Sequence, residues 1–297
     1  MYESHFGLRE PPFSLTPDTD YYFSYADHQE ALNVLLVALR MGEGFLKITG
    51  EVGTGKTLIC RKLLNILSDE GVVTAYIPNP YLTPSALRYC LAEELGVDYP
   101  MNIGGHRALQ LINKQLIALK ASGHQVILLL DEAQALPEET LEAIRLLTNL
   151  ETEKSKLLQV VLFGQTELDE HLNRPSVRQL KQRITFSHAI HPLDRDGCEG
   201  YLYHRLSVAG YRGDKLFDIK AMEWLCRGSR GIPRLINILA HKAMLAAYGE
   251  GKTAIDKYHV KRAIDDTEDA FFLPGRFSRL WQMLFNRRST PALRGGS

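Results

Sequence analysis

The chain has 297 residues, of which 45% are hydrophobic and 24% charged, a composition typical of a soluble globular protein with one large or two modest domains. Its 35 basic and 35 acidic side chains give a formal net charge of +0, which argues against a protein that coats nucleic acid through bulk charge. The sequence has neither a recognisable signal peptide nor a run of about 20 apolar residues, so we expect a protein that is not integral to a membrane.

The four cysteines, Cys60, Cys90, Cys198 and Cys226, are far apart, and no pair has the close spacing of a zinc site. We expect them to be small, reduced side chains of the core, which suits the cytosol. A chain of this length can bury enough apolar surface to fold without a disulfide or a structural metal.

Residues 1–24 are rich in proline and aromatic residues, which favours an ordered, extended N-terminal arm because aromatic side chains gain from burial. The chain then alternates between apolar strands and amphipathic helices as far as Pro192. We expect strands at 45–49, 72–77, 126–130, 157–163 and 183–190, and helices at 28–40, 56–69, 83–95, 106–121 and 137–150. This alternation predicts an α/β domain over residues 25–192, with helices on both faces of a central parallel five-stranded sheet.

After Pro192 the periodicity is only helical, at 196–209, 220–229, 232–248 and 256–269. We therefore expect a second, small all-helical domain over residues 193–270. Residues 271–297 differ again, because they contain arginines but, beyond Pro274, no acidic residue, and their aromatic and leucine side chains recur at helical spacing. Such a basic amphipathic tail suits an anionic membrane surface, a groove on a partner protein, or the surface of the helical domain itself.

A glycine-rich turn follows the first strand and leads into a helix: Gly50-Glu51-Val52-Gly53-Thr54-Gly55-Lys56-Thr57, with Leu58 completing the candidate binding run. It matches the P-loop pattern G-x-x-x-x-G-K-[ST] at every fixed position. The glycines let successive backbone N–H groups point into one anion-sized hollow, and the helix N-terminus adds its positive end. Lys56 would carry its charge to the β- and γ-phosphates, and Thr57 would offer its hydroxyl to Mg²⁺. The motif predicts binding of ATP with Mg²⁺.

The third strand, residues 126–130, is entirely apolar and ends in Asp131-Glu132. A strand of this kind lies at the centre of a sheet, so Asp131 would emerge at the carboxyl edge, where ligands bind in α/β folds. We assign Asp131 to the Mg²⁺ site and Glu132 to the general base that activates the attacking water. A helix-capping acidic pair is the plainer alternative.

Two further features follow in order: Phe163-Gly164-Gln165 after the fourth strand, and Gly231-Ile232-Pro233-Arg234 at the start of a helix in the second domain. Together with the P-loop, they resemble the AAA+ ATPases over about residues 1–270. The resemblance implies that Gln165 is the first sensor, where asparagine or threonine is commoner, and that Arg234 is a second sensor that reaches the γ-phosphate from a helical lid. A hydrogen bonder at a strand end and a surface arginine are the alternatives.

AAA+ proteins usually work as rings, often hexamers, in which each subunit lends an arginine to its neighbour's ATP. The resemblance therefore implies self-association, with Arg183, directly before the fifth strand, as the first choice for this arginine and Arg178 as the second. The alternative for both is a solvated basic helix face.

Residues 5–13, Asp131-Glu132-Ala133-Gln134 and residues 164–168 resemble the ATPases related to the secretion protein ExeA (GspA). Residues 76–83 and 142–151 resemble, within that group, the MshM ATPases of the mannose-sensitive haemagglutinin pilus, a type IV pilus. The resemblance implies that the arm contacts the adenine through His5, Phe6 and Pro11, although plain packing of the arm on the core is equally open.

The same resemblance implies an ATP-hydrolysing motor of a type IV pilus or a type II secretion-like system, with inner-membrane components as partners. ExeA-type proteins continue into a membrane span and a peptidoglycan-binding domain, which this sequence lacks, so we expect a cytoplasmic motor. Peripheral contact with the inner membrane would involve residues 274–288. Two other functions stay open: a DNA-transposition ATPase of the TniB kind, which the neutral charge disfavours, and a nucleotide-gated scaffold with little turnover.

Overall fold

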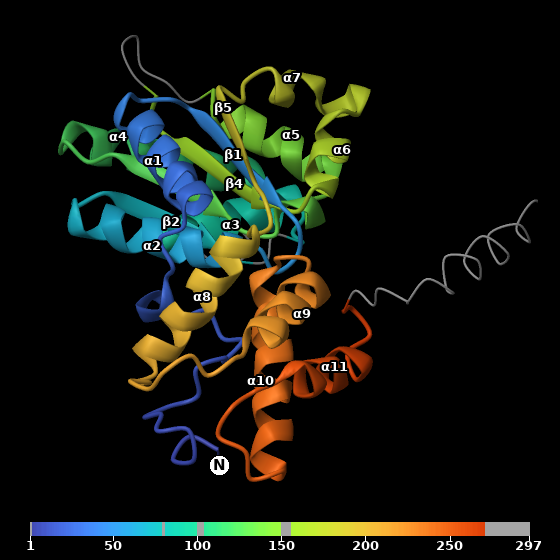
Figure 1. Ribbon diagram of the computed structural model, residues 1–297. Helices are drawn as coiled ribbons and strands as arrows, with labels where there is room; N and C mark the ends of the chain where they lie inside the picture. Colours follow the sequence, from blue (N-terminus) through green and yellow to red (C-terminus); the bar gives the residue numbers. More distant parts are fainter. Residues whose placement is uncertain (1, 79–80, 100–103, 150–155, 271–297) are drawn as a thin grey trace, which may run out of the picture.

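The computed structural model describes residues 2–78, 81–99, 104–149 and 156–270. Within these ranges, five strands form one parallel sheet in the order β2-β3-β4-β1-β5 (Figure 1). The strands are β1 (Phe45–Gly50), β2 (Val73–Ile77), β3 (Val126–Leu130), β4 (Gln159–Gly164) and β5 (Phe186–Ile190). The predicted parallel five-stranded sheet is therefore confirmed.

The strand order brings together three strand ends that are distant in sequence. β1 lies between β4 and β5, and β3 lies on the other side of β4. In this register Thr49 pairs with Gly164, and Leu130 pairs with Leu162. The residues that follow β1, β3 and β4 therefore meet at the carboxyl edge of the sheet, the usual ligand-binding edge of an α/β fold.

Helices cover both faces of the sheet, as the sequence predicts. One face carries α1 (Ala26–Arg40) and α2 (Lys56–Asp69). The other carries α3 (Pro84–Glu94), α4 (Gly105–Ala121), α5 (Glu138–Leu147), α6 (Glu167–Leu172) and α7 (Arg178–Lys181). Successive strand side chains alternate between the two cores, because neighbouring residues of a strand point to opposite faces: Ile127 and Leu129 pack toward α1 and α2, whereas Leu128 and Leu130 pack toward α3–α5.

Four helices follow the sheet: α8 (Arg195–Val208), α9 (Ile219–Ser229), α10 (Pro233–Gly249) and α11 (Lys257–Asp265). They occur where helical periodicity was predicted and lie beyond the carboxyl edge of the sheet (Figure 1). They share one hydrophobic core, separate from the two cores of the sheet. The basic tail predicted over residues 271–297 lies outside the described residues.

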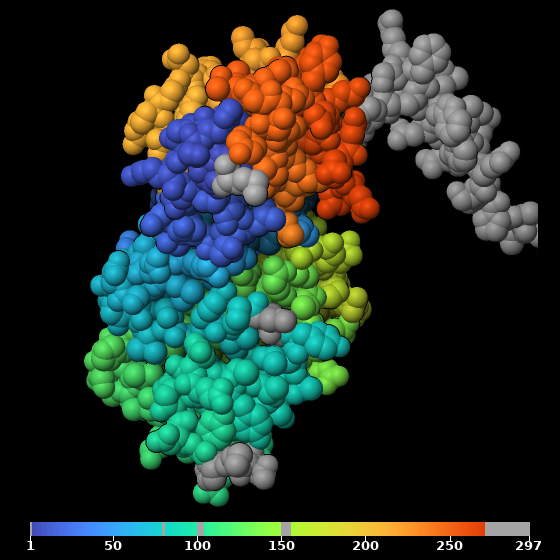
Figure 2. All heavy atoms as spheres, turned by 90° about the horizontal axis from the view of Figure 1, so that it is seen from below, coloured from blue at the N-terminus to red at the C-terminus, as the bar shows by residue number. Residues whose placement is uncertain are grey.

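The N-terminal arm packs mainly into the core of the helical domain, and only Tyr22 of its described residues packs against a core of the sheet. Its buried aromatic and leucine side chains pack with those of α8–α11; they are Tyr2, Phe6, Leu8, Phe13 and Tyr21. Figure 2 shows the arm, in dark blue, against the orange helices. Burial of large aromatic side chains is the main energy available to hold such a segment, so the arm and the helical domain form one packed unit.

Three smaller features complete the fold. β5 begins at Phe186 and not at Arg183, because the Arg183 amide donates to the Leu180 carbonyl (2.9 Å) and closes the turn after α7. All four cysteines are free, and Cys60 and Cys198 are buried. Among the described helices, none combines the length and the apolar character that crossing a bilayer requires.

Candidate nucleotide-binding site

The P-loop has the backbone geometry that its glycines predict. Gly53 and Gly55 have φ values of 83° and 99°, in the left-handed region that favours glycine. A Cβ atom on Gly53 would lie 2.6 Å from the Cβ of Arg234, and one on Gly55 would lie 3.1 Å from Nε2 of His28. The glycines therefore permit both the curled loop and the close approach of α1 and α10 to it.

Lys56, the first residue of α2, is 5% exposed, and its ammonium donates to the carbonyls of Gly50 (2.9 Å) and Glu51 (2.8 Å). Burial lowers the pKa of Lys56, while the nearby carboxylates of Glu132 and Asp131 act in the opposite direction. The loop carbonyls thus hold a cation beside the hollow in which the P-loop pattern binds phosphate.

Asp131 follows β3 directly and is 2% exposed. Burial raises its pKa, whereas hydrogen bonds from the Thr57 hydroxyl and the Glu132 amide favour the ionised carboxylate. A carboxylate beside a hydroxyl is an oxygen pair that fits Mg²⁺, which usually takes one or two protein ligands with waters and substrate phosphates. Among the described residues, no group of three or more His, Cys, Asp or Glu could hold a metal ion.

Glu132 is one of two non-glycine residues in the described structure with a positive φ, 53°. Its Oε2 accepts hydrogen bonds from Nε2 of Gln134 (2.6 Å) and Nε2 of Gln165 (3.1 Å). Oε1 of Gln134 in turn accepts from the backbone amide of Gln165 (2.9 Å). Because both side-chain amides donate to Oε2, the orientation of the carboxylate is fixed.

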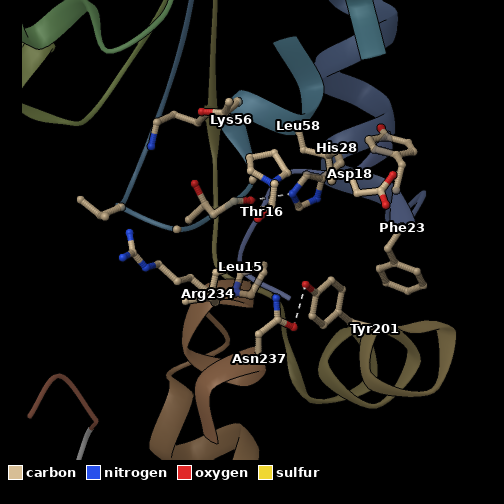
Figure 3. A pocket seen from close by; sticks show the side chains of 18 of the residues that line it. Leu15, Thr16, Asp18, Phe23, His28, Lys56, Leu58, Tyr201, Arg234 and Asn237 are labelled. Carbon is tan, nitrogen blue, oxygen red and sulfur yellow. Dashed lines mark hydrogen bonds between the residues drawn. The ribbon is translucent and has the colours of Figure 1, made fainter. Parts of the chain in front are cut away.

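Arg234 approaches the P-loop from the helical domain. It lies in the first turn of α10, and its backbone amide donates to the Gly53 carbonyl (3.2 Å). Figure 3 shows the charged ends of Lys56 and Arg234 turned toward the same side of the site. The structure therefore brings Lys56, Glu132, Gln165 and Arg234 to one cavity between the sheet and the helical domain.

This cavity has a volume of about 300 Å³, at the lower end of the range of roughly 300–1,000 Å³ for small-molecule sites. P-loop residues 52–58 line the cavity, as do residues 14–18, Tyr22, Phe23 and His28. His28 is buried and its Nε2 lies 2.7 Å from the Thr54 carbonyl, so α1 also supports the P-loop. In the sequence, the only sign of this role is that His28 falls on the apolar face of the predicted helix.

The adenine contacts expected from the arm need a correction. The arm lines the cavity through residues 14–18, and His5, Phe6 and Pro11 lie outside it. Nε2 of His5 lies 3.0 Å from the Lys252 carbonyl, the Phe6 ring is buried in the core of the helical domain, and Pro11 is exposed. The aromatic residues are used to attach the arm, which leaves the following segment to face the cavity.

Comparisons with known proteins agree with this geometry. Residues 39–172 match the family described as "AAA domain". Cdc6p from Pyrobaculum aerophilum superposes with a TM-score of 0.65 at 21% identity, over 84% of this chain and 70% of that one. ORC2 of Aeropyrum pernix, in ADPNP and ADP complexes, superposes with a TM-score of 0.62 at 17% identity, over 87% and 73%. The chain has the AAA+ fold of the P-loop NTPases.

General secretion pathway protein A of Aeromonas hydrophila is 45% identical to the chain over 255 residues, which are 86% of this chain and 46% of that protein. The chain therefore spans about half the length of this relative. The AAA+ fold also gives the helical domain its ordinary name, the lid.

Arg183 and Arg178, the two candidates for the arginine that a subunit lends to its neighbour's ATP (the arginine finger), lie away from the cavity of their own chain. Arg178 is exposed on α7, and Arg183 follows α7, with its Nη1 3.4 Å from Oγ1 of Thr148. Neither lines the cavity. A role in this AAA+ site would require them to act on a neighbouring subunit.

Gln134 is a site residue for which the sequence alone predicted no role. It lies in the short 3-10 helix Ala133–Ala135 and joins Glu132, after β3, to Gln165, after β4. The available signal was its position in Asp131-Glu132-Ala133-Gln134, where a polar residue follows a buried strand and an acidic pair.

Proposed function

We propose that the chain binds and hydrolyses ATP with Mg²⁺. The convergence of the P-loop, Glu132 and Arg234 on one cavity, with Asp131 hydrogen-bonded to Thr57 of the P-loop, supports this most strongly. In the proposal, P-loop N–H groups and Lys56 bind the phosphates, and Thr57 and Asp131 hold the metal ion. Mg²⁺ would neutralise charge on the β- and γ-phosphates. Glu132 accepts a proton from the attacking water, and Gln165 and Arg234 contact the γ-phosphate.

We further propose that this ATPase works as a self-associating ring, as a hexamer in the commonest arrangement, on the cytoplasmic face of the inner membrane. Its partners would be inner-membrane components of a type II secretion-like system or of a type IV pilus of the mannose-sensitive haemagglutinin kind. The 45% identity to a general secretion pathway protein supports the first of these settings. Residues 274–288 would supply peripheral contact with the membrane.

The replacement Lys56→Ala tests nucleotide binding. We expect it to weaken binding of a fluorescent ATP analogue by about 10- to 100-fold, the effect of losing hydrogen bonds from a charged group. Equilibrium titration followed by fluorescence anisotropy measures this, and Lys114→Ala, which removes an exposed lysine of α4, is the matched control. Equal affinity in both variants would contradict the site. Binding of the protein to DNA with an affinity that falls steeply as the salt concentration rises would favour a nucleic-acid regulator instead.

The replacement Gln134→Ala tests the hydrogen bonds that orient the general base. We expect kcat to fall about 10-fold with little change in KM, because Glu132 loses a donor while the phosphate-binding groups stay in place. Gln179→Ala, at an exposed position of α7, is the control. If Gln134 acts through Glu132, Gln134→Ala has no further effect on kcat in a Glu132→Gln background. A further decrease there would show that Gln134 acts by another route.

A further inference from the structure

A buried arginine of the lid fastens the N-terminal arm. Arg205, in α8, is 5% exposed. Its Nε donates to the Pro12 carbonyl (2.6 Å) and its Nη2 to the Ser14 carbonyl (3.1 Å). The guanidinium carbon also lies 4.4 Å from the ring centroid of Tyr21. One edge of the guanidinium, Nε and Nη2, therefore holds the arm, and a cation over an aromatic face adds to the attachment.

The segment that begins at this attachment lines the cavity. Residues 14–18 face it together with Tyr22 and Phe23. Leu15 is 53% exposed although it is a large apolar residue, so it offers the cavity an unpacked apolar surface. Figure 3 shows Phe23 and Tyr201 at the end opposite the charged groups of Lys56 and Arg234. One end of the cavity thus suits phosphates, and the other suits the apolar and aromatic contacts of a nucleoside.

Arg205 also connects this wall to the helix that carries Arg234. Its Nη1 lies 3.4 Å from the Tyr201 hydroxyl, which donates to Oδ1 of Asn237 (3.1 Å). Asn237 lies in α10, three residues after Arg234, and both line the cavity. The arm, α8 and α10 share the core of the lid. The wall at residues 14–18 and Arg234 are therefore both attached to the lid. Each also contacts the sheet domain, since the Pro17 carbonyl accepts from Nη1 of Arg61 in α2 (2.6 Å) and the Arg234 amide donates to Gly53.

We propose that Arg205 is a positioning residue that fastens residues 14–18 to the lid as the nucleoside wall of the site, so that the nucleoside as well as the γ-phosphate holds the lid against the P-loop. This proposal rests on the proposed ATP binding. It assigns the arm a role at the opposite end of the cavity from the phosphates, and it makes nucleoside recognition dependent on a residue about 190 positions later in the chain.

The replacement Arg205→Lys tests the proposal, because lysine keeps the charge but does not reproduce the divergent donors of a guanidinium. Binding of MgATP and of magnesium tripolyphosphate, which has no nucleoside, is measured by calorimetry on the full chain. We expect affinity for ATP to fall about 10-fold while affinity for tripolyphosphate is unchanged. Arg212→Lys, an exposed arginine that bonds only residues near it, is the matched control and should leave both affinities unchanged.

A second variant, Leu15→Ser, changes the wall at an exposed position that no core depends on, and the same selective loss is expected. Unchanged ATP affinity in Arg205→Lys and Leu15→Ser would overturn the proposal. Equal losses for ATP and tripolyphosphate would also overturn it, because a general loosening of the structure affects both ligands. If the wild-type chain binds ATP no more tightly than tripolyphosphate, the nucleoside wall is wrong. If it binds neither ligand, the proposed function itself fails.

Discussion

Replacement of Glu132 by glutamine is expected to reduce ATP turnover by about 10²–10⁴-fold, the usual contribution of a positioned general base. Glutamine has nearly the same shape but does not accept a proton from water at neutral pH. Its carbonyl oxygen can still accept the hydrogen bonds that Gln134 and Gln165 donate to Oε2 of the carboxylate. The backbone at position 132 and the phosphate-binding loop should therefore stay in place, and ATP should still bind.

Two measurements on the same preparation check this prediction: phosphate release at saturating MgATP, and equilibrium binding of ATP. Glu139→Gln, at an exposed position of α5, is the control for the loss of one negative charge. A rate for Glu132→Gln close to that of the wild type would remove Glu132 from the reaction. The third function left open by the sequence, a nucleotide-gated scaffold, predicts a wild-type rate that is already as low as that of the variant.

The parts of the site that could be predicted are those in which sequence neighbours act together. The P-loop is a continuous run from Gly50 to Thr57, and the acidic pair directly follows a strand that is apolar at all five positions, Val126–Leu130. Local periodicity also predicted α2 over residues 56–69, because its buried face repeats at helical spacing. Strand pairing then places these runs at one edge without further information.

Contacts between distant residues could not be predicted in this way. Gln134 and Gln165 are 31 positions apart, and Arg205 and Pro12 are 193 positions apart. Gln134 and Gln165 each lie in a motif, but no periodicity or motif indicates that the members of either pair touch, since each contact depends on how whole elements pack. The same reason explains the error in the arm: aromatic content predicted burial correctly, but which segment is buried and which faces the cavity depends on the position of α8 and α10.

Replacement of Arg183 by alanine is expected to lower turnover by about 10³-fold if this residue supplies positive charge to a neighbour's ATP. Arg183 lies outside the cavity of its own chain. Its Nη1 lies 3.4 Å from the Thr148 hydroxyl, and its charge helps to lower the pKa of Glu142. Arg174, by comparison, is paired with Glu138 of the same chain. Within the described residues Arg183 has no ion pair of this kind, so it is the freer of these two to act on another subunit. The specific activity of the wild type should also rise with protein concentration.

Mixing the two inactive variants gives the sharpest test of a shared site. A subunit with Arg183→Ala keeps its Glu132, and a neighbour with Glu132→Gln keeps its Arg183, so a site formed between them has both groups. We expect the mixture to regain part of the wild-type activity although each variant alone has almost none. Arg178→Ala, mixed in the same way, tests the second candidate. If Arg183→Ala alone is as active as the wild type, and a mixture of Arg178→Ala with Glu132→Gln regains activity, then Arg178 is the arginine that acts on the neighbour's ATP. If neither arginine affects a rate that is independent of concentration, each chain completes its own site, and the ring is not part of catalysis.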